Sequence, residues 1–267
     1  MRVILVMQKT YDTEILICCP SKGRAKTCST HKILPSVKYF VSEDEYEEYC
    51  ANVGAERVVS VSRDIQCKPA GKCRTLNYIL DNYKTDNNVI LFTDDDIKTV
   101  KRIDFLQKWT DKDCSEDELK ILLCKLKKIA DSIGAKIGGF CSVVPSDVLQ
   151  MGASNKFKLT QKKYIDGKAF IIYTDDGTRY DEELYLKEDI DFNCQSLRKN
   201  KRTLSAQFVC FSGVALTNKG GCVDVRTNEK ELEQGAKMIK KYGDMLTLRI
   251  SNVGNGVRRK AVQFGIR

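Results

Sequence analysis

The sequence predicts an α/β protein with a mixed, mainly parallel, Rossmann-like sheet flanked by helices. Short β-branched or apolar runs alternate with segments of helical spacing through the first hundred residues. One run, residues 89–92 (VILF), is apolar throughout, which is typical of a central strand buried on both faces. The chain turns acidic directly after this run, at the edge where open α/β sheets bind ligands.

The first half is expected to alternate strands with helices. Its strand segments are residues 14–19, 37–42, 57–61 and 89–92. The acidic segment 43–52 is expected to be a surface helix capped by Ser42, with Glu45 three residues on. Residues 71–83 carry an apolar stripe at helical spacing that would lie against the sheet. The stripe consists of Leu76, Ile79, Leu80 and Tyr83.

The second half is less regular. Its clearest element is a long helix over residues 115–133, where Ser115 and Glu118 resemble a capping box and Gly134 is a plausible stop. Another helix is expected over residues 188–199. The expected strands are residues 135–144, 169–174 and 207–211.

Length and composition favour one folded unit. A chain of 267 residues can bury one sizeable core but is short for two independent domains. Its 42% apolar and 8% aromatic residues are typical of a globular protein. We therefore expect residues 1–267 to form a single domain that ends in a basic tail.

Charge, cysteine and histidine content narrow the range of partners. The net charge of +9 favours polyanionic partners such as nucleic acid or a phosphorylated substrate, although a lysine-rich solvated surface would give the same charge. The twelve cysteines include no C-x-x-C pair and the only histidine is His31, so a structural zinc site is not expected. His31 is expected to end a helix or to pack rather than to catalyse.

The sequence gives no sign of a membrane or export segment. Polar residues from Gln8 to Asp12 interrupt the N-terminal apolar stretch, and no later run approaches membrane-spanning length. We therefore expect a cytoplasmic protein that has reduced thiols and no membrane partner.

The chemistry is concentrated at Thr93-Asp94-Asp95-Asp96. Repulsion among clustered carboxylates is relieved by a hard divalent cation, and Mg²⁺ or Mn²⁺ is commonly held by one or two carboxylates together with substrate phosphates. The pair Asp94 and Asp96 can supply such oxygens if the strand ends there. A solvated turn or a helix cap without metal is the alternative. A second acidic pair, Asp175-Asp176 before Gly177, is interpreted as a hairpin turn.

Several ordered motifs resemble a known enzyme family. The series Gly71-x-x-Arg74-x-x-Asn77, apolar strand and TDDD resembles the nucleotide-sugar-binding half of glycosyltransferase-A-type enzymes. With P-S-K-G-R after the first strand, KEDIDF at 187–192 and Gly220-Gly221-Cys222, the likeness narrows to the TET-associated glycosyltransferases, many of them phage enzymes that modify hydroxymethylated DNA bases. It spans roughly residues 14–222.

The resemblance implies a donor site in the first half, about residues 14–100. Its cofactors would be a divalent cation, Mn²⁺ or Mg²⁺, and a nucleotide-sugar, a UDP-sugar by analogy. Asp96 would be the principal metal ligand, with Asp94 assisting, and Asp94 and Asp95 would approach the ribose. The residues implied to border the nucleotide or its phosphates are Pro20, Ser21, Arg24, Arg74 and Asn77. Arg74 could instead face solvent, and Asn77 could cap local backbone.

The second half, about residues 101–267, would bind the acceptor. Asp189 is the first candidate for the catalytic base, with Glu188 and Asp191 as alternatives, and an ordinary acidic first turn of a helix is a competing interpretation. Neighbouring helical positions diverge by about a hundred degrees, so these three carboxylates cannot all point to one place. Many relatives use a later histidine as a metal ligand, but His31 precedes the acidic motif.

The implied acceptor is DNA that carries hydroxymethylated bases, in the host cytoplasm if a phage encodes the protein. Candidate phosphate contacts are residues 199–202 (KNKR) and 258–260 (RRK), and the target base would have to leave the duplex. A protein, glycan or small-molecule acceptor is the first alternative. A noncatalytic nucleic-acid-binding relative is the second.

Overall fold

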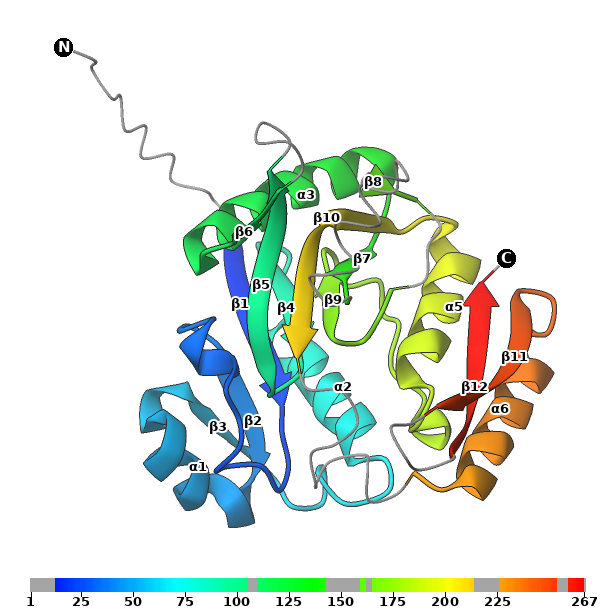
Figure 1. The fold of residues 1–267 in the computed structure, drawn as a ribbon, viewed down its shortest axis with the longest axis horizontal. Coiled ribbons are helices and arrows are strands. Elements are labelled where there is room, and N and C mark those ends of the chain that lie inside the picture. Colours follow the sequence, from blue (N-terminus) through cyan, green and yellow to red (C-terminus); the bar gives the residue numbers. More distant parts are fainter. Residues whose placement is uncertain are drawn as a thin grey trace.

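Figure 1 shows the computed structural model, which describes residues 13–104, 110–142, 159–161, 165–213, 226–253 and 259–266. Within these residues, one ten-stranded sheet has the order β3-β2-β1-β4-β9-β7-β10-β5-β6, and β8 pairs with β10. The strands are β1 Glu14–Pro20, β2 Lys38–Ser42, β3 Val58–Val61, β4 Asn88–Thr93, β5 Ile97–Asp104, β6 Thr110–Asp113, β7 Ile137–Cys141, β8 Leu159–Thr160, β9 Ala169–Ile172 and β10 Leu204–Gly213.

The sheet is mixed, and its parallel pairs are concentrated in the first half. Strands β3, β2, β1 and β4 are parallel to one another. From β4 onward the pairs with β9, β7, β5 and β6 are antiparallel, except that β7 and β10 are parallel. This arrangement confirms the predicted α/β class and the helix-flanked mixed sheet.

Helices cover both faces of the sheet because its central strand is apolar on both sides. In β4, Val89 and Leu91 belong to one hydrophobic cluster, and Ile90 and Phe92 belong to the other. This alternation follows from the two-residue period of a strand. The helices are α1 Tyr46–Val53, α2 Gly71–Tyr83, α3 Glu116–Ile133, α5 Glu188–Asn200 and α6 Asn228–Tyr242.

The best-predicted helices are α2 and α3. The apolar stripe of α2 packs against Ile90 and Phe92, as its spacing predicted. In α3, the predicted capping box is present, because Ser115 Oγ accepts from the Glu118 N–H and the Glu118 carboxylate accepts from the Ser115 N–H. Gly134 ends the helix with a φ of 74°, a left-handed conformation that glycine adopts without strain.

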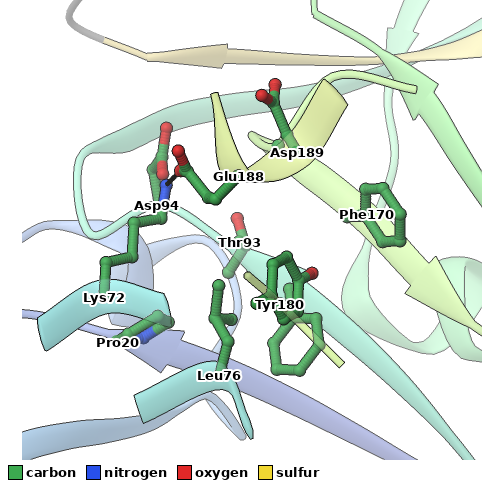
Figure 2. Close-up of a pocket in the computed structure, with 11 residues that line it drawn as sticks. Pro20, Lys72, Leu76, Thr93, Asp94, Phe170, Tyr180, Glu188 and Asp189 are labelled. Atoms are coloured by element: carbon green, nitrogen blue, oxygen red, sulfur yellow. Dashed lines mark ion pairs between the residues drawn. The ribbon is translucent and has the colours of Figure 1, made fainter. Parts of the chain in front are cut away.

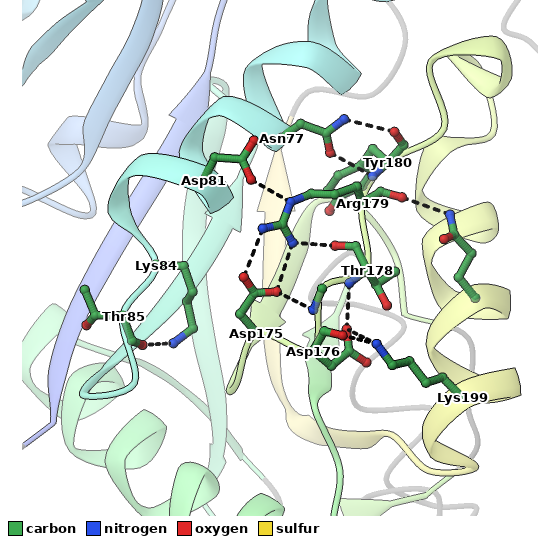
Figure 3. A network of polar contacts seen from close by, with 12 residues as sticks. Asn77, Asp81, Lys84, Thr85, Asp175, Asp176, Thr178, Arg179, Tyr180 and Lys199 are labelled. Carbon is green, nitrogen blue, oxygen red and sulfur yellow. Dashed lines mark hydrogen bonds and ion pairs between the residues drawn. The ribbon is translucent and has the colours of Figure 1, made fainter.

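Two local predictions were wrong. The segment 43–52 is helical but begins with a 3-10 turn, Glu43–Glu45. Ser42 stands at its N-cap position, yet the Ser42 side chain makes no capping hydrogen bond. Asp175 to Gly177 do form a turn, with Gly177 at a φ of 78°, but no strand follows, so it is not a hairpin. Figure 3 shows that this turn is instead tied to α2 and α5.

The C-terminal part of the described chain forms a small unit beside α5. A two-stranded antiparallel sheet, β11 Leu246–Val253 and β12 Arg259–Ile266, follows α6. Figure 1 shows α5 between the main sheet and α6. Strands β5, β6, β8, β11 and β12 and helix α6 were not predicted from sequence. None of the helices in the described residues is both long and apolar enough to span a membrane.

Candidate active site

The site lies where β1 and β4 end. These strands are parallel and in register, with Cys18 opposite Phe92, so their carboxyl ends meet at one edge of the sheet. Pro20 ends β1 and Thr93 ends β4. The loop after β1 folds onto the acidic triplet, because the Thr30 hydroxyl donates to the Asp94 carbonyl at 2.7 Å. The structure therefore places P-S-K-G-R and TDDD side by side.

Asp95 anchors this loop. Its carboxylate oxygens accept hydrogen bonds from two loop residues, one from the Ser21 hydroxyl and one, at 2.8 Å, from the Arg24 guanidinium. The backbone carbonyl of Asp95 accepts from the N–H of Ser29 at 2.8 Å. Asp95 is buried, so these partners compensate its lost hydration. Ser21 and Arg24 are therefore engaged with Asp95 in this structure.

Asp94 faces the opening instead. It lines a small pocket that is open to solvent. The surrounding protein raises the pKa of Asp94 to about 6, since burial disfavours the charged carboxylate; Lys72 opposes this shift, and neighbouring Asp95 and Asp96 add to it. Asp94 is thus a carboxylate that would gain from additional positive charge.

The pocket joins the two halves of the chain. Figure 2 shows most of its lining residues. They come from the ends of β1 and β4, from α2, from β9 and the segment before it, from the segment before α5, and from the first turn of α5. Of the predicted site residues, four line it together: Pro20, Asp94, Glu188 and Asp189. The other lining residues are Lys72, Leu76, Phe92, Thr93, Gly167, Phe170 and Tyr180.

A lysine bridges the pocket. Lys72, in the first turn of α2, places its Nζ 2.9 Å from Oε1 of Glu188 at the start of α5. Figure 2 shows Asp94 beside this ion pair. Lys72 was not predicted from the sequence, although it lies within the Gly71 to Asn77 motif. The available signal was a basic residue at the start of α2, the helix that precedes β4 and its acidic end. Gly167 and Tyr180 gave no comparable signal.

Asp189 packs against the segment before β9. A Cβ at Gly167 would lie 3.3 Å from the Asp189 Cβ and 3.6 Å from its Oδ2, so glycine leaves room for this carboxylate. The amide of Asn193 donates both to the Ile165 carbonyl and to the Asp189 carbonyl, each at 2.9 Å. These contacts fix the first turn of α5 against the pocket.

Three predicted residues lie elsewhere. Arg74 pairs with Glu182 at 2.7 Å rather than entering the pocket. Asn77 forms two hydrogen bonds with the backbone of Tyr180, at 2.8 and 3.0 Å. It therefore binds backbone that is distant in sequence, not the local backbone of the alternative, and it holds a pocket-lining residue. Asp191 is fully buried, and its carboxylate accepts from Tyr242 and Gln195, both at 2.6 Å. Its contacts are structural, as expected for at least one of three neighbouring carboxylates.

Asp96 and His31 also lie outside the pocket lining. Asp96 is buried, with Oδ2 4.0 Å from the Arg24 guanidinium, and a Cβ at Gly213 would lie 3.0 Å from its Oδ1. His31 lies in the short helix Thr30–Lys32, and its ring forms a hydrogen bond of 3.1 Å with the hydroxyl of Tyr39 in β2. This is the expected packing role. Gly220 to Cys222 lie outside the described residues.

Of the three aspartates after β4, Asp94 is the one that lines the pocket and could hold a cation together with a bound phosphate. Among the side chains that the structure describes, no three of the His, Cys, Asp and Glu type gather into a complete metal site. Asp95 is committed to Arg24, whereas Asp94 has a raised pKa and faces the pocket. Mg²⁺ and Mn²⁺ commonly take one or two carboxylates plus substrate phosphates, so a partial protein site suits them.

Fold and site together define an α/β protein with an acidic pocket at the carboxyl edge of its sheet, where such proteins bind their ligands. The chain belongs to the TET-associated glycosyltransferase family, whose model matches residues 15–221. The family name indicates glycosyltransferase activity, and the match confirms the resemblance seen in the sequence.

Two solved structures show only a distant likeness to the chain. The chain is similar to a mycobacterial protein, with 11% identity, a TM-score of 0.49, and coverage of 95% of this chain and 84% of the other. It is similar to mannose-6-phosphate isomerase from Helicobacter pylori, with 10% identity, a TM-score of 0.31, and coverage of 93% and 85%. Likenesses this distant say nothing about activity. No curated protein matches the chain.

Proposed function

We propose that the protein transfers a sugar from a UDP-sugar to the hydroxyl of a hydroxymethylated pyrimidine in DNA, with the help of a divalent cation. One observation carries this proposal: Pro20 and Asp94 of the predicted donor half line the same pocket as Glu188 and Asp189 of the predicted acceptor half. A glycosyltransferase has to bring its two substrates together in this way. Membership of the TET-associated glycosyltransferase family supports the reaction class.

The donor would bind along the ends of β1 and β4. The loop that holds Pro20, Ser21 and Arg24 would border the nucleotide, with Arg24 kept in place by Asp95. Asp94 and Asp95 would face the ribose side, and Asp94 and Asp96 would hold Mn²⁺ or Mg²⁺. The bound cation supplies positive charge that stabilises the leaving diphosphate.

Arg74 and Asn77 would support the donor site indirectly. Asn77 fixes the backbone of Tyr180, which lines the pocket. Arg74 joins α2 to Glu182, in the segment before α5. Both contacts join α2 to the chain that leads into α5. These two residues therefore act on the walls of the site.

In the transfer step, the acceptor hydroxyl oxygen attacks the anomeric carbon. The bond from that carbon to the diphosphate oxygen breaks, and UDP leaves with the bonding electron pair. Asp189 would take the hydroxyl proton. Glu188 is less suited to this task, because its carboxylate is paired with Lys72.

A DNA acceptor is supported by the charge of the chain, which is +9. At the end of α5, Lys201 is exposed, while Lys199 and Arg202 also contact protein groups, Asp176 and the Ile133 carbonyl. The tail cluster at 258–260 is the other candidate phosphate contact; Arg258 lies outside the described residues. Such a reaction would take place in the cytoplasm, that of the host if a phage encodes the protein.

The test offers a panel of UDP-sugars with unmodified or hydroxymethylated DNA, with and without Mn²⁺ or Mg²⁺, and follows the product by mass. We expect transfer only to hydroxymethylated DNA and only with a cation. Asp96→Ala should abolish it, whereas Asp113→Ala, which removes an exposed carboxylate from β6, should not. Undiminished transfer by Asp96→Ala would remove the metal assignment. Transfer to a protein, glycan or small molecule instead would overturn the DNA acceptor.

A further inference from the structure

Helix α6 carries buried polar side chains on the face that meets the segment leading into α5. Glu231, Gln234, Met238 and Tyr242 are all buried and follow one helical stripe. Gln234 is fully buried, and an amide in that position is costly unless it is hydrogen-bonded. The contact is therefore more specific than the packing of an apolar stripe.

Each polar side chain of this stripe bonds to a residue within 183–191, and Glu231 also pairs with Arg226 at 3.3 Å. Gln234 donates to the Glu183 carbonyl at 2.8 Å and accepts from the Leu186 N–H at 3.5 Å. Glu231 pairs with Lys187 at 2.6 Å, and both side chains are buried. These partners lie immediately before the first turn of α5, which carries Glu188 and Asp189 into the pocket.

The end of α6 forms polar contacts with α5 itself. The Tyr242 hydroxyl donates to Asp191 Oδ1 at 2.6 Å, and Lys241 Nζ lies 2.9 Å from the same oxygen. Lys241 also pairs with Asp181 at 2.6 Å, so it joins both ends of the segment. Because Asp191 is fully buried, these donors replace the hydrogen bonds that its carboxylate would make with water.

Apolar packing alone would not fix this geometry. Met238 and Tyr242 pack with Ile190 and Cys194, but such contacts tolerate small shifts. Hydrogen bonds are directional and set the position of α5 along α6. The family match ends at residue 221, before α6 begins, so the α6 side of the contact lies outside the match while residues 183–191 lie inside it.

We infer that α6 positions the acidic wall of the pocket, with Glu231, Gln234, Lys241 and Tyr242 as positioning residues. They hold residues 183–191 so that Glu188 and Asp189 face the donor side. As a statement about catalysis, this inference rests on the proposed transferase function. As a statement about structure, it can be tested without activity.

The test uses the full chain with Tyr242→Phe, alone and combined with Lys241→Met. Tyr242→Phe keeps the ring and removes only the hydroxyl, so it preserves packing. We expect amide hydrogen exchange of residues 188–194 to rise about tenfold or more in the double variant, while α2 is unchanged. In transfer assays, kcat should fall by about tenfold or more with the KM for the UDP-sugar unchanged.

Lys237→Met is the matched control, because Lys237 stands on α6 but pairs with Glu233 of the same helix. It should leave exchange and kcat unchanged. Unaltered exchange of residues 188–194 in the double variant would overturn the inference whether or not the protein transfers sugar. A wild-type protein that transfers nothing would sink the proposed function, while the exchange result still decides the role of α6.

Discussion

At the scale of single residues, the three adjacent aspartates after β4 divide into different roles. Asp95 is buried against Arg24 and Ser21, whereas Asp94 faces the pocket with a pKa raised to about 6. Asp96 is buried near Arg24 and Gly213. The division follows from the chain direction at a strand end, where consecutive side chains point to different sides. One acidic motif thus both anchors the loop and lines the pocket.

The Arg24–Asp95 pair gives a stability prediction. Arg24→Met leaves the buried Asp95 carboxylate without its cation, and we expect the free energy of unfolding to fall by about 2–4 kcal/mol. The double variant Arg24→Met with Asp95→Asn removes both charges and should recover part of that loss. Urea denaturation of the three proteins measures the difference. If the double variant is less stable than Arg24→Met, the ion pair does not anchor the loop.

The two pocket carboxylates of α5 give a prediction about catalysis. Asp189→Asn should lower kcat by about 10²–10⁴-fold, since a general base contributes roughly that factor. Glu188→Gln should lower kcat less, because Glu188 is already paired with Lys72. Initial rates of transfer at saturating donor compare the two variants. A larger loss in Glu188→Gln than in Asp189→Asn would exchange their roles.

At the scale of elements, the turn after β9 connects α2 with the segment that enters α5. Figure 3 shows Arg179 at its centre. The guanidinium binds both oxygens of Asp175, at 2.9 and 3.0 Å, and Asp81 of α2 at 2.8 Å. The Arg179 carbonyl accepts from Gln195 of α5 at 2.9 Å. The turn therefore fixes the distance between two walls of the pocket.

This turn gives a prediction about pH. Hydrogen bonds from Arg179 hold the pKa of Asp175 below its ordinary value of 3.8. The pair therefore stabilises the fold above pH 3.8, and its contribution is lost as the pH falls through the lower pKa of the folded state. Arg179→Met should lower the free energy of unfolding by about 1–2 kcal/mol at pH 7, and the gap to the wild type should narrow below about pH 3.8.

Urea denaturation at several pH values measures that gap. Lys127→Met serves as the control, because Lys127 and Asp131 form an i, i+4 pair within α3, and such a pair contributes about 0.3–0.5 kcal/mol. A gap for Arg179→Met that stays constant down to pH 3 would show that Asp175 is not its partner.

The elements that could be predicted from sequence are those with a strong local signal. β4 is apolar throughout, α2 has a regular stripe, and Ser115 with Gly134 marks the ends of α3. The predicted pocket residues that came together, Pro20, Asp94, Glu188 and Asp189, follow strands or begin a helix. A local pattern is sufficient to place such residues at an edge of the sheet.

The parts that were missed depend on distant contacts. β5 carries charged residues at alternate and adjacent positions, and its antiparallel pairing with β10 joins segments about a hundred residues apart. The buried face of α6 includes Glu231 and Gln234, so its periodicity is hidden by polar residues. Arg74 was expected to contact the nucleotide-sugar, but it forms an ion pair with Glu182. Glu182 is distant in sequence, so no local pattern could predict this partner.

At the scale of the whole molecule, the net charge of +9 leads to a prediction about DNA binding. Basic residues that neutralise phosphates release counterions, so the logarithm of the binding constant should fall linearly with the logarithm of salt concentration, by about 0.9 per phosphate contact. We expect this behaviour with both unmodified and hydroxymethylated duplexes. Fluorescence anisotropy over a salt series measures the slope.

Lys201 allows this prediction to be localised. It is exposed, ends α5, and has a φ of 64°, a conformation that asparagine also accepts. Lys201→Asn should therefore remove the charge without strain and reduce the salt slope by about 0.9, the share of one phosphate contact. Lys26→Asn, at an exposed position of the loop after β1, should leave the slope unchanged. Equal slopes for Lys201→Asn and the wild type would exclude the end of α5 from the DNA-binding face. A DNA-binding constant that does not change with salt concentration would argue against a DNA acceptor altogether.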